Sequence, residues 1–364
     1  MHSDQPTLNE LLADQRALDE ALLDQIWRQW RLIGASATAR GSHASVSTVV
    51  DPETLILVSL LYSTKEPRLG DLIADWAMHN VDLLSVQRVR NLLGTYPAAV
   101  HDLLESRLAW FAEIAVTEGA DPRWRPLLKP ATERDAVPLR AGGKRAMRAP
   151  VTSPSCLLLS LRLGLGVGAK ADLVAFLLGS QSPHAVREMA QAVGYTVSAC
   201  RRSVEELSEA GWLELHHGQP AQYRAHWTRW RSLLGLQHEE TPPWEYWHQR
   251  FVLVTAFALF CEHLERVLAV STPAPSAVGT EMRLLLEQHR EVLGRLDVAS
   301  WGAHQHVTEW VGFGGTVMRR MAGLLAPRMP SPHAVEGDQR TTMVGLGFLC
   351  VRREVIRGLV KRSP

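Results

Sequence analysis

The sequence predicts a mostly α-helical protein with one small β-hairpin. Apolar residues recur at spacings of three and four along most of the chain, which is typical of helices that bury one face. Breaks rich in proline and glycine divide this pattern into segments of ordinary helix length. Two strand-like pieces, Trp212–Leu215 and Gln222–Ala225, flank a Gly-Gln-Pro turn. With 364 residues, of which 46% are hydrophobic, the chain can form two or three domains with their own cores.

The first helix is expected within residues 1–33, as an amphipathic arm. Its apolar residues recur near helical spacing, and two tryptophans, Trp27 and Trp30, lie near its end. We expect this arm to dock on the next domain or on a second subunit. The segment from Gly34 to Ser47 is small and polar, as flexible linkers are.

Residues 51–120 are expected to form a compact helical domain. Asp51, Pro52 and Glu53 make a strong helix start, because they supply a cap, a first residue without an N–H to satisfy, and an acid near the positive end of the helix dipole. Four helical patterns follow, separated by breaks at residues 65–67, 80 and 94–97. Residues 121–154 then form a basic linker, whose six prolines forbid long helices.

The stretch from Ser182 to Ala225 predicts two short helices in succession, followed by the hairpin. Ser182 can cap the first helix, and Pro183 suits its first position. Gly194 ends that helix, where a left-handed residue is wanted. Thr196 is the expected cap of the second helix. The apolar stripe of the second helix comprises Cys200, Val204 and Leu207.

This order of elements resembles the winged helix-turn-helix of the MarR/ArsR-type bacterial transcription regulators. The resemblance covers residues 170–225 and rests on Ala190 in the first helix, Gly194 in the turn, and Cys200 and Val204 in the second helix. It implies a winged helix-turn-helix domain at residues 155–232, a β-hairpin wing, and binding to double-stranded DNA as a homodimer. The recognition helix, about Thr196–Ala210, would then lie in the major groove.

The outer face of the second helix and the hairpin supply the candidate DNA contacts. On the helix these are Thr196, Ser198, Arg201, Arg202 and Glu205, and on the hairpin His216, His217, Gln219 and Arg224. Arginine side chains at such positions can reach guanine edges or phosphates. The basic linker, with eight basic residues against three acidic ones, is either a solvated connection or an arm along the phosphate backbone. Its candidate auxiliary phosphate contacts are Arg140, Lys144, Arg145 and Arg148.

Three alternatives stay open. Residues 170–231 contain seven basic and six acidic residues, so a winged helix here can instead serve an interaction protein or an antitoxin-like scaffold. The dense aromatic set after the hairpin can form an effector pocket in a regulator that senses a small molecule. That set comprises Trp227, Trp230, Trp244, Tyr246, Trp247 and Phe251, and its four tryptophans are the candidate pocket residues. Residues 85–93 can be a degenerate second recognition helix with Gln87, Arg88 and Arg90 outward, although an ordinary helical bundle is the default.

Residues 242–364 are expected to form a C-terminal helical region. A long helix ends near Leu268, and further helical patterns cover residues 281–296 and 305–325. The final segment, residues 341–364, combines an apolar half with a basic tail and fits an edge strand as well as a helix.

The sequence indicates neither an enzyme nor a metal or cofactor site. The four cysteines are far apart among apolar neighbours, which predicts buried reduced thiols. No histidine cluster, phosphate loop or nucleophile elbow has the required spacing. The start of the chain lacks a signal-peptide pattern, and the longest apolar run, Phe251–Cys261, is about half the ~20 residues that a membrane span needs. We therefore expect a cytoplasmic protein that does not enter a membrane.

Overall fold

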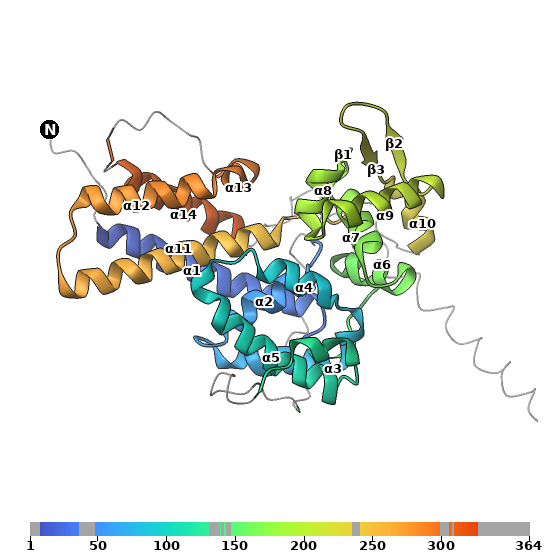
Figure 1. Ribbon diagram of the computed structural model, residues 1–364, viewed down its shortest axis with the longest axis horizontal. Helices are drawn as coiled ribbons and strands as arrows, with labels where there is room; N and C mark the ends of the chain where they lie inside the picture. Colours follow the sequence, from blue (N-terminus) through green and yellow to red (C-terminus); the bar gives the residue numbers. More distant parts are fainter. Residues whose placement is uncertain are drawn as a thin grey trace, which may run out of the picture. The chain divides into compact units, whose positions relative to one another are not determined.

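The computed structural model describes residues 8–35, 48–130, 147–234, 241–298 and 309–326, together with Leu139, Gly142, His306 and Val307. These residues are mostly helical and contain one three-stranded antiparallel sheet (Figure 1). The α-helices are α1 (Leu8–Leu32), α2 (Pro52–Tyr62), α3 (Pro67–Asn80), α4 (Val86–Leu93), α5 (His101–Thr117), α6 (Leu157–Leu165), α7 (Ala169–Ser180), α8 (Val186–Val193), α9 (Val197–Glu209), α10 (Trp227–Leu234), α11 (Trp247–Val270), α12 (Pro275–Gln288), α13 (Arg290–Arg295) and α14 (Glu309–Leu325). Short 3₁₀ turns are η1 (Val81–Leu83), η2 (Ala98–Val100), η3 (Pro122–Leu127) and η5 (Pro154–Cys156).

The described residues bury two hydrophobic cores. The larger core joins α1 to α2–α5 and to the C-terminal helices α11–α14. The smaller core lies among α6–α10 and the sheet, and its largest fully buried side chain is that of Phe176. Both cores belong to one compact unit.

Helix α1 packs within the larger core along α14, α11 and α2 (Figure 1). Its inward stripe includes Leu18, Leu22 and Ile26, which have no exposed surface. At its end, the indole Nε1 of Trp30 donates to Ser59 Oγ at 2.8 Å. The predicted arm therefore docks on other helices of its own chain.

The four helices expected in residues 51–120 are α2 to α5. Asp51 caps α2 as predicted, because its side chain accepts from the Thr54 amide at 3.3 Å. The chain that follows stays on this bundle at first: Trp124 in η3 is fully buried, with its ring 4.9 Å from that of Phe111. Within the described part of residues 121–154, the basic segment therefore packs on the helical domain rather than leaving it.

The smaller core holds α8 and α9, which meet at Gly194, where φ is +72°. Helix α9 begins after Thr196, whose hydroxyl accepts from the Ala199 amide at 3.2 Å, as predicted. The predicted start of α8 is wrong. The helix begins at Val186, because the preceding pair, β1 (His184–Ala185), is held as a strand; Ser182 and Pro183 therefore lie before it.

The sheet has the strand order β1-β3-β2, with β2 (Glu214–His216) and β3 (Gln222–Arg224) forming the expected hairpin. Leu215 lies opposite Tyr223, and His184 pairs with the same Tyr223 from the other side. The buried Tyr223 ring thus fixes the hairpin to the smaller core. The link between Gln219 and Pro220 in the turn is a cis peptide bond.

Three of the four cysteines lie in described segments. Cys156, Cys200 and Cys261 are buried and free, as predicted, and Cys350 lies outside the described residues. The predicted segment at residues 341–364 lies outside them as well. No helix in the described ranges is both long enough and apolar enough to cross a membrane.

Candidate nucleic-acid interface

Helix α9 presents the face that the sequence predicted. Its buried residues are Cys200, Ser203, Val204 and Leu207. Its candidate contact residues are all exposed: Thr196, Ser198, Arg201, Arg202 and Glu205. Within the described chain, neither Arg201 nor Arg202 forms an ion pair, so both guanidinium groups are available to a partner.

The hairpin presents its candidate residues less uniformly. His217 and Gln219 at the turn are exposed, whereas His216 and Arg224 are half-buried. His226 forms a hydrogen bond through Nε2 with the Glu214 carboxylate, and His216 Nε2 lies 3.6 Å from the same carboxylate. The bond from His226 lowers the pKa of Glu214, so this acid stays charged beside the hairpin.

The structure describes one of the four auxiliary phosphate candidates. Arg148 donates through Nη2 to Asp82 Oδ2 at 2.7 Å, and its Nη1 bonds the other oxygen of that carboxylate and the His79 carbonyl. Arg148 would have to leave this bidentate pair to reach a phosphate. Arg140, Lys144 and Arg145 lie outside the described residues.

The four tryptophans of the candidate effector pocket lie in different surroundings. Trp230 is buried in the smaller core, with its ring 5.6 Å from that of Trp212. Trp247 is buried in the larger core, where its Nε1 donates to the Val49 carbonyl at 3.2 Å. Trp244 packs at 5.7 Å from Phe176. Trp227 borders a separate cavity of about 210 Å³ near the hairpin.

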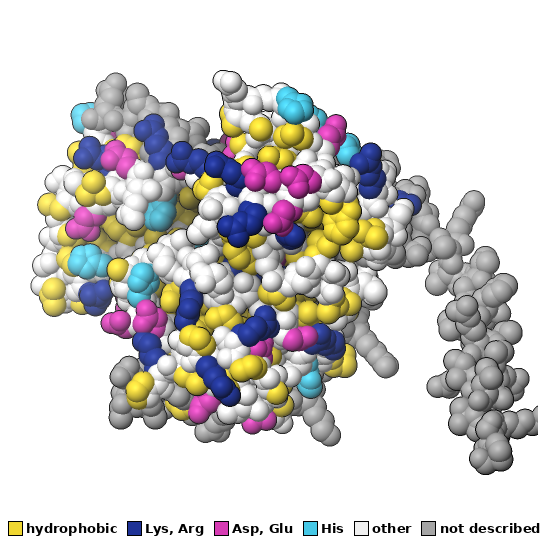
Figure 2. Space-filling view, turned by 45° about the vertical axis from the view of Figure 1, so that its right-hand side comes forward, with side chains coloured by type: hydrophobic (Ala, Val, Ile, Leu, Met, Phe, Trp, Pro, Cys, Tyr) yellow, Lys and Arg dark blue, Asp and Glu magenta, His cyan; other side chains and the backbone are white. Residues whose placement is uncertain are grey.

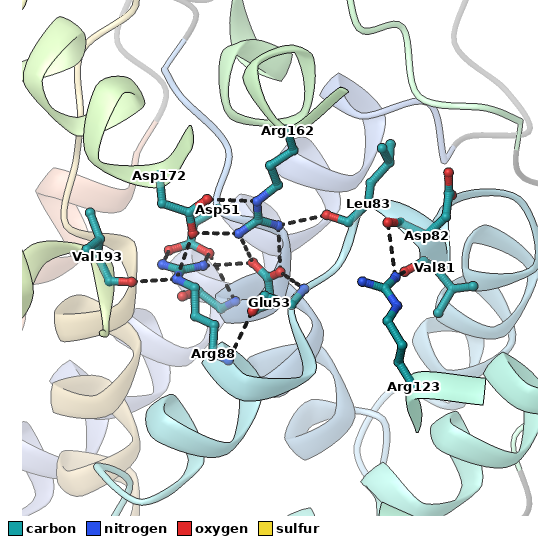
Figure 3. A network of polar contacts seen from close by, with 12 residues as sticks. Asp51, Glu53, Val81, Asp82, Leu83, Arg88, Arg123, Arg162, Asp172 and Val193 are labelled. Carbon is teal, nitrogen blue, oxygen red and sulfur yellow. Dashed lines mark hydrogen bonds and ion pairs between the residues drawn. The ribbon is translucent and has the colours of Figure 1, made fainter. Parts of the chain in front are cut away.

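A buried charge cluster that the sequence did not reveal lies next to Val193, the last residue of α8 (Figure 3). Two arginines, Arg88 of α4 and Arg162 of α6, meet three carboxylates: Asp51, Glu53 and Asp172. All five side chains are at most 4% exposed. Arg88 contacts both oxygens of Asp51 at 2.5 Å, and Arg162 donates to Glu53 Oε1 at 2.6 Å and to Asp172 Oδ2 at 2.7 Å.

Burial and pairing act in opposite directions on the acids of this cluster. Burial raises the pKa of Asp51, but Arg88 outweighs burial, so the net pKa of this carboxyl lies below its usual value. At Asp172 burial outweighs Arg162, and the pKa is raised. The pKa values of Arg88 and Arg162 are raised by their carboxylate partners, which outweigh desolvation. Two buried cations thus stay charged within the protein.

Helix α4 connects this cluster to the turn between α8 and α9. The Nε of Arg88 donates to the Val193 carbonyl at 2.6 Å (Figure 3). One turn later, Asn91 Nδ2 donates to the Gly194 carbonyl at 3.0 Å. The proposal that Arg88 points outward from a second recognition helix is therefore wrong, because Arg88 is fully buried and neutralises acids from α2. Arg90 on the same helix is exposed.

No group of three or more histidine, cysteine, aspartate or glutamate residues in the described segments has the geometry to hold a metal ion. No protein-family model, curated protein or solved structure matches the chain.

Proposed function

We propose that this protein is a DNA-binding transcription regulator with a central winged helix-turn-helix, in which α9 enters the major groove. The observation that carries the proposal is the division of α9 into two faces. Cys200, Val204 and Leu207 anchor one face, while Arg201 and Arg202 stand exposed and unpaired among the described residues on the other. A recognition helix needs one face buried in its own domain and an opposite, polar face exposed to the DNA groove.

The neighbouring elements support the same arrangement. The turn before α9 is held through its carbonyls by Arg88 and Asn91, so the first residues of the helix have a defined position. The hairpin after α9 exposes His217 and Gln219, which suits a wing beside the groove. A homodimer would place two such helices about one DNA turn apart.

Charge limits the affinity expected from one copy. Residues 170–231 carry only one more basic than acidic residue, and Lys170 is paired with Glu206 at 2.6 Å. On the face shown in Figure 2, Lys and Arg side chains are interspersed with Asp and Glu rather than gathered into one basic area. Dimerisation would double the contacts to phosphate, which dominate affinity for DNA.

The experiment is a selection of duplexes from a random library by the full chain, followed by fluorescence anisotropy on the enriched duplex. We expect an enriched motif with two related half-sites about 10 base pairs apart. With about five phosphate contacts, the logarithm of affinity should fall against the logarithm of salt concentration with a slope near −4 to −5.

The test variant is Arg201→Ala with Arg202→Ala, which should abolish specific binding without unfolding the protein. The matched control, Arg31→Ala with Arg266→Ala, removes the same charge from two exposed positions on α1 and α11 and should keep specific binding. Survival of specific binding in the test variant would refute the assignment of α9.

A specific observation favours one other function, binding to a protein partner. Trp212 is 42% exposed beside the hairpin, and Leu233 on α10 is 67% exposed. Exposed large apolar groups are typical of protein contacts. Absence of an enriched motif, together with a flat salt response on random duplex, would favour an interaction or antitoxin-like scaffold protein instead.

A further inference from the structure

A cavity of about 690 Å³ opens beside the first turn of α9. Its wall is formed by residues of α4, α8, α11 and α13 and by the start of α9. Thr196 and Val197 form part of its wall, next to Tyr195 and Gly194. Its volume falls in the range of roughly 300–1,000 Å³ that is usual for small-molecule sites.

Cationic groups outnumber anionic ones around this cavity. Arg187 of α8 is exposed and forms no ion pair with a described residue. Arg295 of α13 donates to Gln191 on α8 at 2.9 Å and pairs with Glu291, the one acidic residue of the wall, at the same distance. The thirteen-residue helix α9 adds the positive end of its dipole at Val197. The field in the cavity therefore favours an anion.

Three residues of the wall carry buried polar atoms without a hydrogen-bond partner in the described structure. These are the Tyr195 hydroxyl, His248 Nδ1 and Gln249 Oε1. Burial lowers the pKa of His248 to about 4, so its ring is neutral and offers one acceptor or donor at Nδ1. Its Nε2 is already bonded to Thr95. Buried polar atoms without partners are costly, so a turn of these side chains toward the cavity would let a polar ligand supply the missing bonds.

The wall also has an apolar part, made of Leu92, Ala190, Val252 and Val292. The cavity is also far larger than an inorganic anion requires. A ligand that fits this wall has two features. One is an anionic group with several acceptor oxygens, which the guanidinium groups and the helix N–H groups can bind; the other is an organic body that contacts the apolar side chains.

We infer that this cavity binds a small phosphorylated organic molecule of about nucleotide size, whose phosphate is held by Arg187, Arg295 and the start of α9. Because Thr196 and Val197 also begin the proposed DNA-reading helix, a bound phosphate lies where a DNA phosphate would approach. Occupancy therefore lowers affinity for DNA. This second step rests on the proposed function, whereas binding in the cavity does not.

The experiment is isothermal titration calorimetry of the full chain, without DNA, against AMP, glucose 6-phosphate, adenosine and inorganic phosphate. We expect at least one of the two organic phosphates to bind more tightly than adenosine and inorganic phosphate. Arg187→Ala should weaken that binding about tenfold or more, as the loss of a charge-assisted bond does. Val292→Trp, which fills the cavity, should abolish it, and a thermal melt checks that this variant folds.

Two controls make the site specific. Arg266→Ala removes an exposed arginine on α11 outside the cavity and should leave binding within twofold of the unmodified chain. Arg201→Ala with Arg202→Ala should bind the organic phosphate normally, since neither residue belongs to the cavity wall. Loss of binding in that pair would assign the phosphate to the α9 face and overturn the inference.

The inference is also overturned if neither organic phosphate binds at millimolar concentration, if adenosine binds as well as AMP, or if Arg187→Ala binds as well as the unmodified chain. Failure of the proposed function is recognised separately. Binding in the cavity by a chain that selects no DNA motif leaves the cavity site standing and removes only the regulatory step. Binding of both ligands without competition refutes that step alone.

Discussion

Replacing Arg88 with methionine should destabilise the protein strongly, because Arg88 neutralises acids that have almost no access to water. Its guanidinium contacts Asp51 through two 2.5 Å bonds and Glu53 through one of 2.7 Å, and it also binds the Val193 carbonyl. The side chains of Asp51 and Glu53 are 4% and 0% exposed. Methionine keeps much of the apolar volume, but it leaves Asp51 without an arginine partner and leaves Glu53 and Asp172 to Arg162 alone.

Removal of one partner from a buried ion pair costs about 3–5 kcal/mol. This is a large share of the roughly 5–15 kcal/mol that stabilises a typical folded domain. The assay is urea denaturation, followed by tryptophan fluorescence and by circular dichroism, so that coincidence of the two transitions can be checked. Arg90→Met on the same helix is the control; Arg90 is exposed, and we expect a change within about 0.5 kcal/mol.

The pH dependence provides a second check on the same variant. In the unmodified chain Arg88 holds the pKa of Asp51 below its usual value, so this acid contributes stability above its unfolded pKa and loses it as the pH falls. Without Arg88, burial raises the pKa of Asp51, and protonation in acid relieves the unpaired charge. The difference between the two proteins should therefore shrink from pH 7.5 to pH 5. A cost equal to that of Arg90→Met, or a difference that grows in acid, refutes this account of the cluster.

Three further outcomes can be measured. Val204→Asp should abolish cooperative folding of the α6–α10 region in near-ultraviolet circular dichroism, because Val204 has no exposed surface and a lone buried charge costs several kcal/mol. Gly194→Ala should destabilise by about 1–3 kcal/mol, since φ is +72° and a Cβ would meet Leu92 Cδ2 at 2.6 Å; Gly211→Ala, with φ +73° and open space around its Cβ, should cost less in the same denaturation assay. Burial raises the pKa of Cys156, Cys200 and Cys261 to about 12. In a Cys350→Ser chain, the three thiols should therefore react slowly with a disulfide reagent at pH 8 until denaturant is added. Fast reaction of the native chain would contradict their burial.

Local patterns in the sequence were sufficient to predict where most helices lie, because apolar periodicity and helix caps depend on residues only a few positions apart. Asp51 and Thr196 cap their helices as predicted, and the buried stripe of α9 is the predicted one. The start of α8 was missed because it depends on β1, whose partner strand β3 lies almost forty residues further along the chain. No local rule contains that pairing.

The buried charge cluster could not be predicted either, because its partners are far apart in the sequence. Arg88 meets Asp51 across 37 positions, and Arg162 meets Glu53 across 109. In sequence, Arg88 lies in an amphipathic helix where an arginine is ordinarily solvated, which is why the outward prediction failed. The tryptophans show the converse, because Trp230 and Trp247 are close in sequence but are buried in different cores.

Helix α4 contacts the charge cluster, the turn between α8 and α9, and the cavity. Arg88 fixes the buried acids of α2 and the last carbonyl of α8, and Asn91 fixes the carbonyl of Gly194, after which α9 begins. Leu92 packs against Gly194, and both Asn91 and Leu92 also line the cavity. The same short helix therefore supports the start of the proposed recognition helix and the wall of the proposed ligand site. A ligand in that cavity would act next to the turn that precedes α9, because α4 both lines the cavity and binds the carbonyls of that turn.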